Sequence, residues 1–576
     1  MHHRFSADDL FGGAALAAPV DNDAFLPVED AAEAAPFEGV LHLSAAMLST
    51  DDTALAGSFR LGGDPRLFPA VDLAFTSSGD ALIPVHPGLH RRRDETSYWD
   101  VMAGTGRIWR EAADGGAMRG AFPLQLSNEH ENESHHLVAT FLWRDGTASA
   151  LAVQKITQTQ PDHLPDGFGL WGRVPARLTS GPVDGAADAR ARHAADAADA
   201  LPIRPIAELE GRVDGGLIAA LGKGYGADSE IVSGVVVDGV IYATAMQVDH
   251  GAAPFPRAMR FGLWSATKAA FATTALLRLA VHLGPEVART RIADVLEVRA
   301  GHDGWANVTI MDCLNMASGI GTAGRSAEPV DIYADNLTEP ENAEAQGDGP
   351  DSYRAYQAWY AARSRQEKLD RAFACPSYPW GPGEFARYRD QDLFMAGAAM
   401  DAVWKRHAGA DADLFAMVAR EVYEPIGIRG LDMNRTREAD GRTGLPLAPF
   451  GLFLGLDDIA KLGALIAGGG RHRGEQMLCP RLLADATDGD VAKGLPTGTT
   501  TVDGEVTYRL AYWQLPYRTR RGRLVRIPSM RGYGGNIIQP LWNGITCFRL
   551  AHDAPNDQDR YDALKLPRIA DALAPL

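Results

Sequence analysis

The sequence contains little lysine and little cysteine. Lysine and arginine together make up 56 of the 576 residues, and only eight of them are lysine, so a lysine inside a motif is informative. The four cysteines lie far apart and form no CxxC pair, which disfavours a disulfide framework or a zinc site and favours reduced thiols. From these residues we expect neither a metal nor another cofactor.

An excess of positive charge and a long apolar run are also missing. The net charge of −18 argues against nucleic acid and anionic membranes as partners, because both bind basic faces. No apolar run approaches the roughly 18 to 20 residues that span a bilayer. The N-terminal segment is weakly hydrophobic and carries Asp8 and Asp9, whereas a secretory signal has a basic start and a stronger apolar core. We expect a cytoplasmic protein, with export as the open alternative.

Composition divides the chain into four parts. Residues 1–36, rich in alanine and aspartate, predict a poorly ordered tail. Residues 37–160 contain short, partly alternating strand patterns separated by turns, which predict a small β-rich domain of unknown role. Residues 161–205 hold proline, glycine and an Ala/Asp/Arg run that predicts a linker, partly helical. Residues 206–576 then form a second domain.

The second domain alternates strand and helix patterns. We expect a hairpin with an Asp-Gly turn, three amphipathic helices, a pair of strands and a closing helix, in the order 231–246, 265–283, 413–428, 456–470, 532–552 and 561–576. Strands, then helices, then strands again are typical of an antiparallel sheet flanked by helices. The predicted fold class is therefore α+β, preceded by the small β-rich domain.

Ser265 and Lys268 form an SxxK pair at the start of the first long helix pattern. Positions i and i+3 share a helix face, so the lysine amine can reach the serine hydroxyl and act as its base. Burial and the positive end of the helix would lower the pKa of this lysine, as a base requires. Chance alone gives about 0.3 such matches in this composition, so the pair needs support from its context.

Four further segments supply that context. ANVTIMDCLNMASGIG at 306–321, YPWGPGEFARYRDQDLFMAG at 378–397, FGLFLGLDDIAKLGALIAGGGRHRGEQMLCPRLL at 450–483 and GYGGN at 532–536 follow the SxxK helix in order. In sequence and order they resemble the serine hydrolases of the β-lactamase and penicillin-binding-protein type. The resemblance covers roughly residues 206–570 and implies a β-lactamase/transpeptidase-like domain.

Two motifs depart from the family pattern. The family's Tyr-x-Asn is here Tyr388-Arg389-Asp390, so an acid replaces an amide. The family's Lys-Thr-Gly or His-x-Gly is here Tyr533-Gly534-Gly535, without the cation or histidine that meets a substrate carboxylate. This form looks more like the class C-related esterase and aminohexanoate-oligomer hydrolase branch, and it puts β-lactam hydrolysis and D,D-peptidase activity in doubt. Asp390 and the third-motif residues are the expected substrate-binding groups.

The resemblance implies acyl transfer to serine. Lys268 would deprotonate Ser265, which would attack an ester or amide carbonyl. The backbone N–H groups of Ser265 and Asn536 would form the oxyanion hole, and Tyr388 would relay a proton to the leaving group. Water would then release the acyl-enzyme.

Three points stay open at this stage. The leading hypothesis is an esterase or amidase acting on a small, uncharged or hydrophobic acyl substrate. The alternatives are a peptidase for D-residues or short peptides and a ligand-binding module without turnover. The long polar stretch 322–376 is a candidate substrate-selecting lid. A homo-oligomer is compatible with the sequence, which does not determine the oligomeric state.

Overall fold

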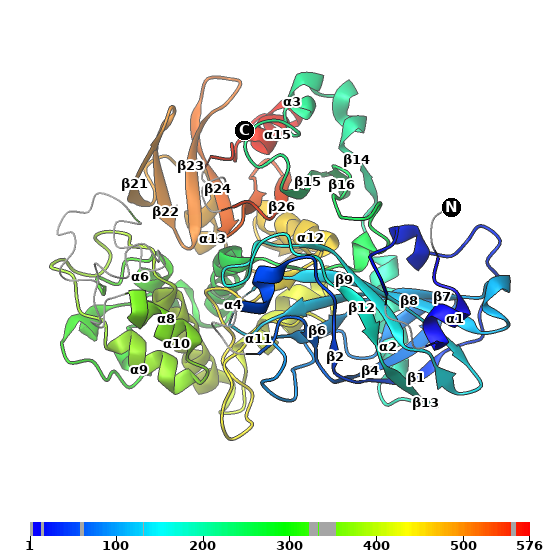
Figure 1. Cartoon of the computed structure of the whole chain (residues 1–576). Helices are drawn as coiled ribbons and strands as arrows, with labels where there is room; N and C mark the ends of the chain where they lie inside the picture. The colour runs from blue at the N-terminus through cyan, green and yellow to red at the C-terminus, as the bar shows by residue number, and fades with distance from the viewer. Residues whose placement is uncertain are drawn as a thin grey trace.

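The computed structural model describes residues 4–12, 16–57, 63–130, 132–321, 332, 353–554 and 560–576. Two large β-sheets and a set of helices make up this part of the chain (Figure 1). The predicted α+β class, with an antiparallel sheet flanked by helices after a β-rich part, is confirmed. Within the described residues, no helix is long and apolar enough to cross a membrane.

The first sheet has eleven strands, and all its pairs are antiparallel. Its strands are β1 (Glu38–Leu43), β4 (Val71–Ser78), β5 (Ala81–Pro84), β6 (Asp100–Ala103), β7 (Gly106–Trp109), β8 (Met118–Ser127), β9 (His135–Arg144), β10 (Thr147–Ala148), β11 (Leu151–Gln158), β12 (Trp171–Val174) and β13 (Ala176–Ser180). The order is β12-β11-β9-β8-β7-β5-β4-β1-β13, with β10 paired to β9 and β6 to β8. A small hairpin of β2 (Ala46–Met47) and β3 (Leu67–Phe68) lies beside it.

The two ends of this sheet are joined by a single residue. Pro175 alone separates β12 from β13, which stand at opposite ends of the strand order. The sheet must therefore curl until its ends meet. The predicted linker at 161–205 is wrong over this stretch, because residues 171–180 complete the sheet. Helix α2 (Ala186–Ala198) then packs against β4 and β5.

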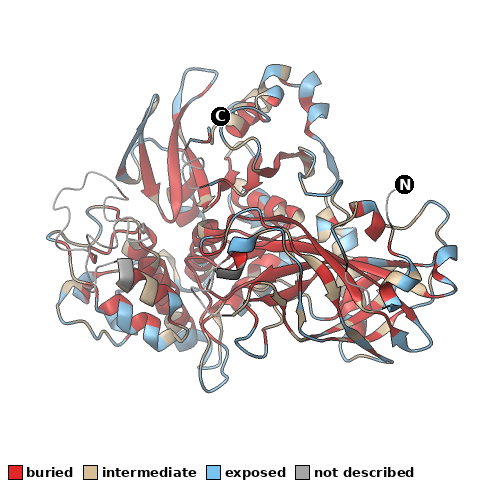
Figure 2. Cartoon of the chain, viewed as in Figure 1, coloured by how far each residue is buried: buried red, intermediate tan, exposed pale blue. Residues whose placement is uncertain are grey.

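The central strands of the first sheet are buried on both faces. On β8 and β9, Phe122 and Phe141 point into the sheet's own core, whereas Ala121 and Leu142 belong to the core of the second half. This alternation is the period of two expected of strands. The two halves of the chain thus share one apolar contact surface. Figure 2 shows the central strands of both sheets buried along most of their length.

The described residues of the N-terminal segment, 4–12 and 16–36, are not the poorly ordered tail that the composition predicts. Phe5, Leu10 and Phe25 are buried in the larger core, and the rings of Phe5 and Phe25 meet edge to face at 5.5 Å. The buried Arg119 donates from Nη2 to the Phe5 carbonyl over 2.9 Å. These three apolar side chains anchor the segment in the core. The prediction of a poorly ordered tail missed them because it rested on the average composition of residues 1–36, which is rich in alanine and aspartate.

The second sheet has nine strands in the order β14-β16-β15-β26-β25-β24-β23-β22-β21. Its strands are β14 (Ile203–Pro205), β15 (Glu230–Val237), β16 (Val240–Ala243), β21 (Leu495–Thr501), β22 (Gly504–Arg509), β23 (Tyr512–Arg518), β24 (Leu524–Gly532), β25 (Asn536–Pro540) and β26 (Thr546–Ala551). Only the β14–β16 pair among them is parallel. Two short pairs, β17 (Phe261–Gly262) with β18 (Phe453–Leu454) and β19 (Arg471–His472) with β20 (Glu475–Gln476), complete the strands.

Most of the remaining helices pack on the second sheet or beside it, whereas α1 packs on β9 of the first sheet. They are α1 (Ala7–Phe11), α3 (Gly215–Ala219), α4 (Thr274–Leu283), α5 (Ile292–Val295), α6 (Ile310–Leu314), α8 (Tyr353–Ala361), α9 (Arg365–Phe373), α10 (Asp390–Ala408), α11 (Leu414–Val418), α12 (Leu456–Ala467), α13 (Pro480–Thr487) and α15 (Lys565–Leu573). Helix α12 crosses β25 and β26 where Gly463 faces Thr546, and an added Cβ would lie 2.3 Å from Thr546 Cγ2. Only glycine permits this close approach.

Candidate active site

Ser265 lies on a tight turn between a strand and a helix. Strand β17 leads into a 3-10 turn, Trp264–Ala266, and a π-helical segment, Lys268–Thr273, which continues as α4. Trp264 has φ of +49°, a left-handed conformation that bulky residues rarely adopt. Left-handed backbone and π-helical turns are both frequent at functional sites. Such strained conformations persist only where the surrounding structure stabilises them.

The β-rich half holds this turn. The Trp264 backbone N–H donates to Asn132 Oδ1 over 2.6 Å, and its indole N–H donates to the Gln160 carbonyl over 3.0 Å. Next to it, the Gly262 N–H donates to Ser134 Oγ over 3.1 Å. The first half of the chain is therefore part of the scaffold of the candidate site.

Lys268 places its side-chain nitrogen against three oxygens. Nζ lies 2.6 Å from Ser265 Oγ, 2.7 Å from Asp390 Oδ1 and 3.0 Å from the Pro449 carbonyl oxygen. Lys268 is only 1% exposed, whereas Ser265 is partly exposed. The Lys268 amine is thus shielded from water while the hydroxyl beside it stays accessible.

Two opposing effects set the pKa of Lys268. Burial disfavours the ammonium and lowers the pKa below its ordinary value, while the carboxylate of Asp390 acts in the opposite direction. Burial is the larger effect, so the net pKa is lowered. A lower pKa makes the neutral amine, which alone can accept the Ser265 proton, available nearer to neutral pH.

Asp390 is the first residue of α10 and has a second partner. The Tyr356 hydroxyl, from α8, donates to Asp390 Oδ2 over 2.8 Å. One carboxylate oxygen therefore faces Lys268 and the other faces Tyr356. Asp390, which stands where the family's second motif has an asparagine, therefore has a partner on each of its two carboxylate oxygens.

Tyr388 lies directly over the lysine. The Lys268 Nζ is 5.0 Å from the centre of the Tyr388 ring, which stacks on Trp513 at 5.8 Å. Burial, followed by the carboxylate of Asp390, raises the pKa of Tyr388 well above its ordinary value, although a hydrogen bond with Ser265 opposes the rise. The phenol is therefore neutral at neutral pH and suits a relay of protons rather than the resting base.

The third motif forms the turn between β24 and β25. The Tyr533 ring meets the Trp264 ring edge to face at 5.5 Å, so it abuts the residue before Ser265. Asn536 uses its side chain within the hairpin, donating to the Tyr533 carbonyl over 3.0 Å and accepting from the Ala551 N–H over 3.2 Å. Only its backbone is left for the predicted oxyanion role.

The glycines of this turn are required by close contacts. Gly534 and Gly535 both have positive φ, at +76° and +82°. A Cβ on Gly534 would lie 2.3 Å from Gln160 Cβ, and one on Gly535 would lie 2.2 Å from Asp553 Oδ2. The third motif thus packs against the same β-rich segment that holds Trp264.

The structure brings the first two motifs together directly. Ser265, Lys268, Tyr388 and Asp390 form one contact cluster. Tyr533 and Gly534 reach it through Trp264 and Gln160, and the strands that flank the third motif, β24 and β25, pack against the turn Trp264–Ala266. The Asn536 side chain bonds instead to Tyr533 and Ala551, and Gly535 lies against Asp553. Most of the lid candidate, 322–331 and 333–352, lies outside the described residues.

Sequence reasoning missed five contributors: Asn132, Gln160, Tyr356, Pro449 and Arg531. Arg531, two residues before the third motif, lies 5.7 Å from the Trp513 ring centre and lowers the pKa of Tyr388. A cation thus lies near Tyr388 although the third motif itself has none. No motif marks any of the five, because each acts through a backbone carbonyl or by its position in space.

Metal ligands and paired thiols are not gathered in this region. Over the described parts of the chain, no group of three or more His, Cys, Asp or Glu side chains is arranged to hold a metal ion. The four cysteines are buried, and none of them forms a disulfide.

Comparison with known proteins found matches among solved structures. No protein-family description matches the sequence. No curated protein matches it either. Solved structures of β-lactamase- and penicillin-binding-protein-like serine hydrolases do match. A protein from Bacillus anthracis assigned as a 6-aminohexanoate-dimer hydrolase is 14% identical, covers 60% of this chain and 80% of its own, and has a TM-score of 0.42.

Two more solved structures give similar values. A penicillin-binding-protein homologue from Caulobacter crescentus is 14% identical, with coverage of 66% and 97% and a TM-score of 0.40. A family VIII carboxylesterase is 15% identical, with coverage of 63% and 96% and a TM-score of 0.39. At this level of identity the likeness concerns the fold and not the activity.

Proposed function

We propose that this chain is a serine hydrolase that cleaves an ester or amide bond through an acyl-enzyme on Ser265. The observation that carries the proposal is the 2.6 Å contact between Lys268 Nζ and Ser265 Oγ in a buried site. A serine hydroxyl needs an adjacent base to become a nucleophile, and a lysine serves as that base only when its pKa is lowered. Both conditions hold for this pair.

Acylation needs two proton transfers, one from Ser265 to Lys268 and one from Lys268 to the leaving group. Neutral Lys268 takes the proton of the Ser265 hydroxyl as Oγ bonds to the carbonyl carbon. The bond to the leaving alcohol or amine then breaks, and the proton passes from Lys268 through the Tyr388 hydroxyl to that leaving group. Backbone N–H groups of Ser265 and Asn536 are the proposed donors to the oxyanion.

Deacylation repeats the sequence with water. A water molecule gives a proton to Lys268 and attacks the acyl carbon. The bond to Ser265 Oγ breaks, the serine regains a proton and the carboxylic acid product leaves. Asp390 touches Lys268 rather than the reacting carbon in this scheme, so it is a positioning residue, and its carboxylate favours the protonated lysine.

Tyr533 supports the proposed substrate class. It occupies the place where drug-binding relatives carry lysine or histidine, and it packs on Trp264. We propose small acyl esters or amides as substrates and poor turnover of β-lactams. A peptidase for D-residues or short peptides remains the second enzymatic candidate, since the same acyl chemistry serves both.

The direct test is active-site labelling. The protein is incubated with a fluorophosphonate probe, and the labelled peptide is identified by mass spectrometry. We expect the label on Ser265 and no label on Ser265→Ala. A label on another serine would overturn the proposal. A panel of p-nitrophenyl esters, anilides, D-residue peptides and nitrocefin then assigns the class. Labelling of Ser265 without turnover of any of them would favour the ligand-binding module.

A further inference from the structure

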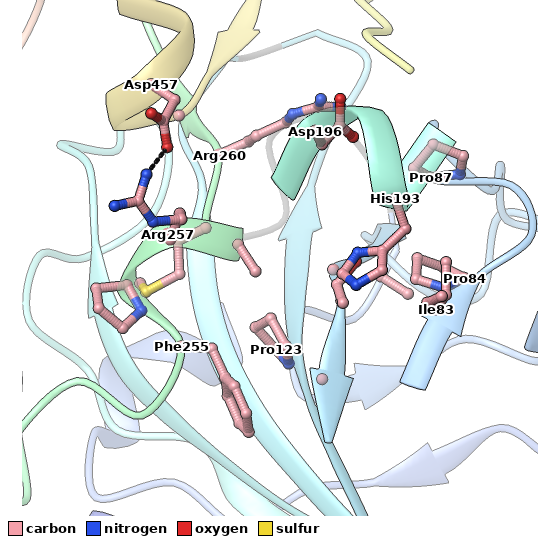
Figure 3. Close-up of a pocket in the computed structure, with 18 of the residues that line it drawn as sticks. Ile83, Pro84, Pro87, Pro123, His193, Asp196, Phe255, Arg257, Arg260 and Asp457 are labelled. Carbon is pink, nitrogen blue, oxygen red and sulfur yellow. Dashed lines mark hydrogen bonds and ion pairs between the residues drawn. The ribbon is translucent and has the colours of Figure 1, made fainter. Parts of the chain in front are cut away.

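A cavity of about 480 Å³ lies between the two halves of the chain, away from Ser265. Its walls come from the first sheet, helix α2, residues 254–260 and the start of α12 (Figure 3). Apolar side chains line much of it, among them Ile83, Pro123 and Phe255. Volumes of this size are typical of sites for small organic molecules.

Two buried polar side chains that line this cavity have unused hydrogen-bonding groups. Gln125 on β8 and His136 on β9 are directly paired across the sheet and are 4% and 1% exposed. Both amide atoms of Gln125 and Nε2 of His136 have no hydrogen-bond partner among the described residues. Leaving such buried groups unpaired is energetically unfavourable. A bound molecule that supplies the missing partners would recover this cost.

The imidazole of His136 is neutral. Burial lowers the pKa of His136 to about 3, so at neutral pH the ring offers one N–H and one lone pair. The Gln125 amide likewise offers both a donor and an acceptor. This pair therefore suits an uncharged polar group, such as a hydroxyl, which donates and accepts at the same time.

The rim of the cavity is positively charged. Three of its cations are balanced by carboxylates of the rim: Arg257 with Asp457, Arg260 with Asp458 and Arg429 with Asp196. Figure 3 shows the first of these pairs at the edge of the cavity. Two further cations have no ion pair among the described residues and donate to backbone carbonyls instead, Arg192 to Pro84 and Val85 and Lys461 to Gly427.

A second cation, Arg260, lies close enough to Arg192 to affect its pKa. Burial and the guanidinium of Arg260 both lower the pKa of Arg192, although Asp196 and Asp188 act in the opposite direction. A positive cavity stands out in a chain with a net charge of −18. An anion entering this cavity would relieve the repulsion between the two guanidinium groups.

We propose that this cavity binds a small organic carboxylate that carries a hydroxyl group on an apolar body. The carboxylate would meet Arg192 in the field of Lys461, the body would pack against Pro123 and Phe255, and the hydroxyl would bond to Gln125 and His136. This site is separate from the proposed acyl-enzyme site and does not depend on it.

One strand pair separates the two sites. Residues 254–260 of the cavity wall run directly into β17, which leads to Ser265. The start of α12, which contacts residues 254–260 through the Arg257–Asp457 ion pair, directly follows β18, and β17 pairs with β18.

The test uses three matched probes and the full chain. Binding of 4-hydroxyphenylacetate, phenylacetate and 4-hydroxyphenylacetamide is measured by ligand-observed NMR titration. We expect the first to bind at one site and the other two, which lack the hydroxyl or the charge, to bind about tenfold more weakly. Equal affinity for all three probes, or no saturable binding, would overturn the proposal.

Four variants locate the site. Arg192→Gln and Gln125→Leu should each weaken 4-hydroxyphenylacetate by about tenfold, which corresponds to about 1.4 kcal/mol. Arg442→Gln removes the same charge from a side chain that is 80% exposed, and should change nothing. Ser265→Ala should also leave the affinity unchanged, whereas a loss in that variant would place the probe at the serine and refute the proposed cavity site.

Gln125→Leu has a second readout that a purely structural glutamine would not give. Since it removes two unpaired buried polar atoms, we expect the free variant to melt at a higher temperature than the wild type. A lower melting temperature together with unchanged probe binding would show that Gln125 has a structural role and would overturn its part in the site.

Discussion

The Lys268 ammonium nitrogen lies 2.7 Å from Asp390 Oδ1, so the proposed base of the site is paired with an acid. An amide at this position would leave Lys268 with burial alone to determine its charge. The carboxylate instead favours the ammonium, which cannot accept the Ser265 proton. The pair therefore sets the lower pH limit of the proposed reaction. Substitutions of Asp390 and of its second partner, Tyr356, should shift that limit in opposite directions.

Asp390→Asn should move the acid limb of activity to lower pH. Removing the carboxylate takes away the interaction that raises the pKa of Lys268, so the neutral amine persists further into acid. The measurement is kcat/KM for p-nitrophenyl acetate against pH. Asp370→Asn, an exposed acid on α9, serves as the control. An unchanged or raised limb in Asp390→Asn would contradict the assignment.

Tyr356→Phe should move the same limb in the opposite direction. The Tyr356 hydroxyl donates to Asp390 Oδ2 and so shares its negative charge. Without that bond, Asp390 attracts the ammonium of Lys268 more strongly, and the pKa of the lysine rises. The same pH profile tests this, and a double variant with Asp390→Asn should show no further effect of the tyrosine. A shift to lower pH would refute the coupling.

Lys268→Arg should lose most activity while keeping its fold. A guanidinium does not deprotonate in a protein, so it cannot act as the base, although it retains the positive charge beside Asp390. We expect turnover to fall by about 10² to 10⁴-fold. Circular dichroism and the melting temperature establish that the variant is folded. Activity near the wild-type level would rule out the lysine-base mechanism.

Asn132→Ala should impair turnover, although Asn132 belongs to the β-rich half of the chain and Ser265 to the other half. Its Oδ1 accepts the Trp264 N–H at 2.6 Å and so supports the left-handed turn before Ser265. Losing one such bond costs about 1 to 3 kcal/mol, and we expect kcat to fall by at least about tenfold. Asn543→Ala removes a side-chain bond to the Ala574 carbonyl elsewhere and is the matched control. Equal kcat in both variants would remove Asn132 from the scaffold.

Arg92→Met should destabilise the whole chain. Arg92 has a side chain only 1% exposed and pairs with Glu129 at 3.0 Å and with Asp100 at 3.3 Å. Removing one partner of a buried charge cluster costs about 3 to 5 kcal/mol. Arg93→Met, at a neighbouring side chain that is 61% exposed, should cost under about 1 kcal/mol. Urea denaturation compares the two, and similar midpoints would contradict the prediction.

Local patterns predicted much of the second half. The hairpin at 231–246, the helix at 456–470 and the strand pair at 532–552 follow from turn residues and from apolar spacing, and β15, β16, α12, β25 and β26 confirm them. The contact between Ser265 and Lys268 likewise follows from their spacing, because three residues on one helical turn determine it.

Long-range effects account for what the sequence did not predict. The strands at 171–180 lie inside the predicted linker, whose proline, glycine and Ala/Asp/Arg run dominate its composition, and they pair with β1 and β11, which are distant or separate segments of the chain. The roles of Asn132 and Tyr356 depend on segments that only the fold brings beside Ser265 and Asp390. Neither effect leaves a periodic signal in the chain.

The closure of the first sheet at Pro175 has a consequence for synthesis on the ribosome. Every strand of that sheet is complete at Ser180, before any residue of the second sheet has been made. Domains near the N-terminus fold first during translation. If the first sheet folds at that stage, the surface that presents Asn132 and Gln160 is in place before the segment around Ser265 emerges, and the serine turn then forms against it.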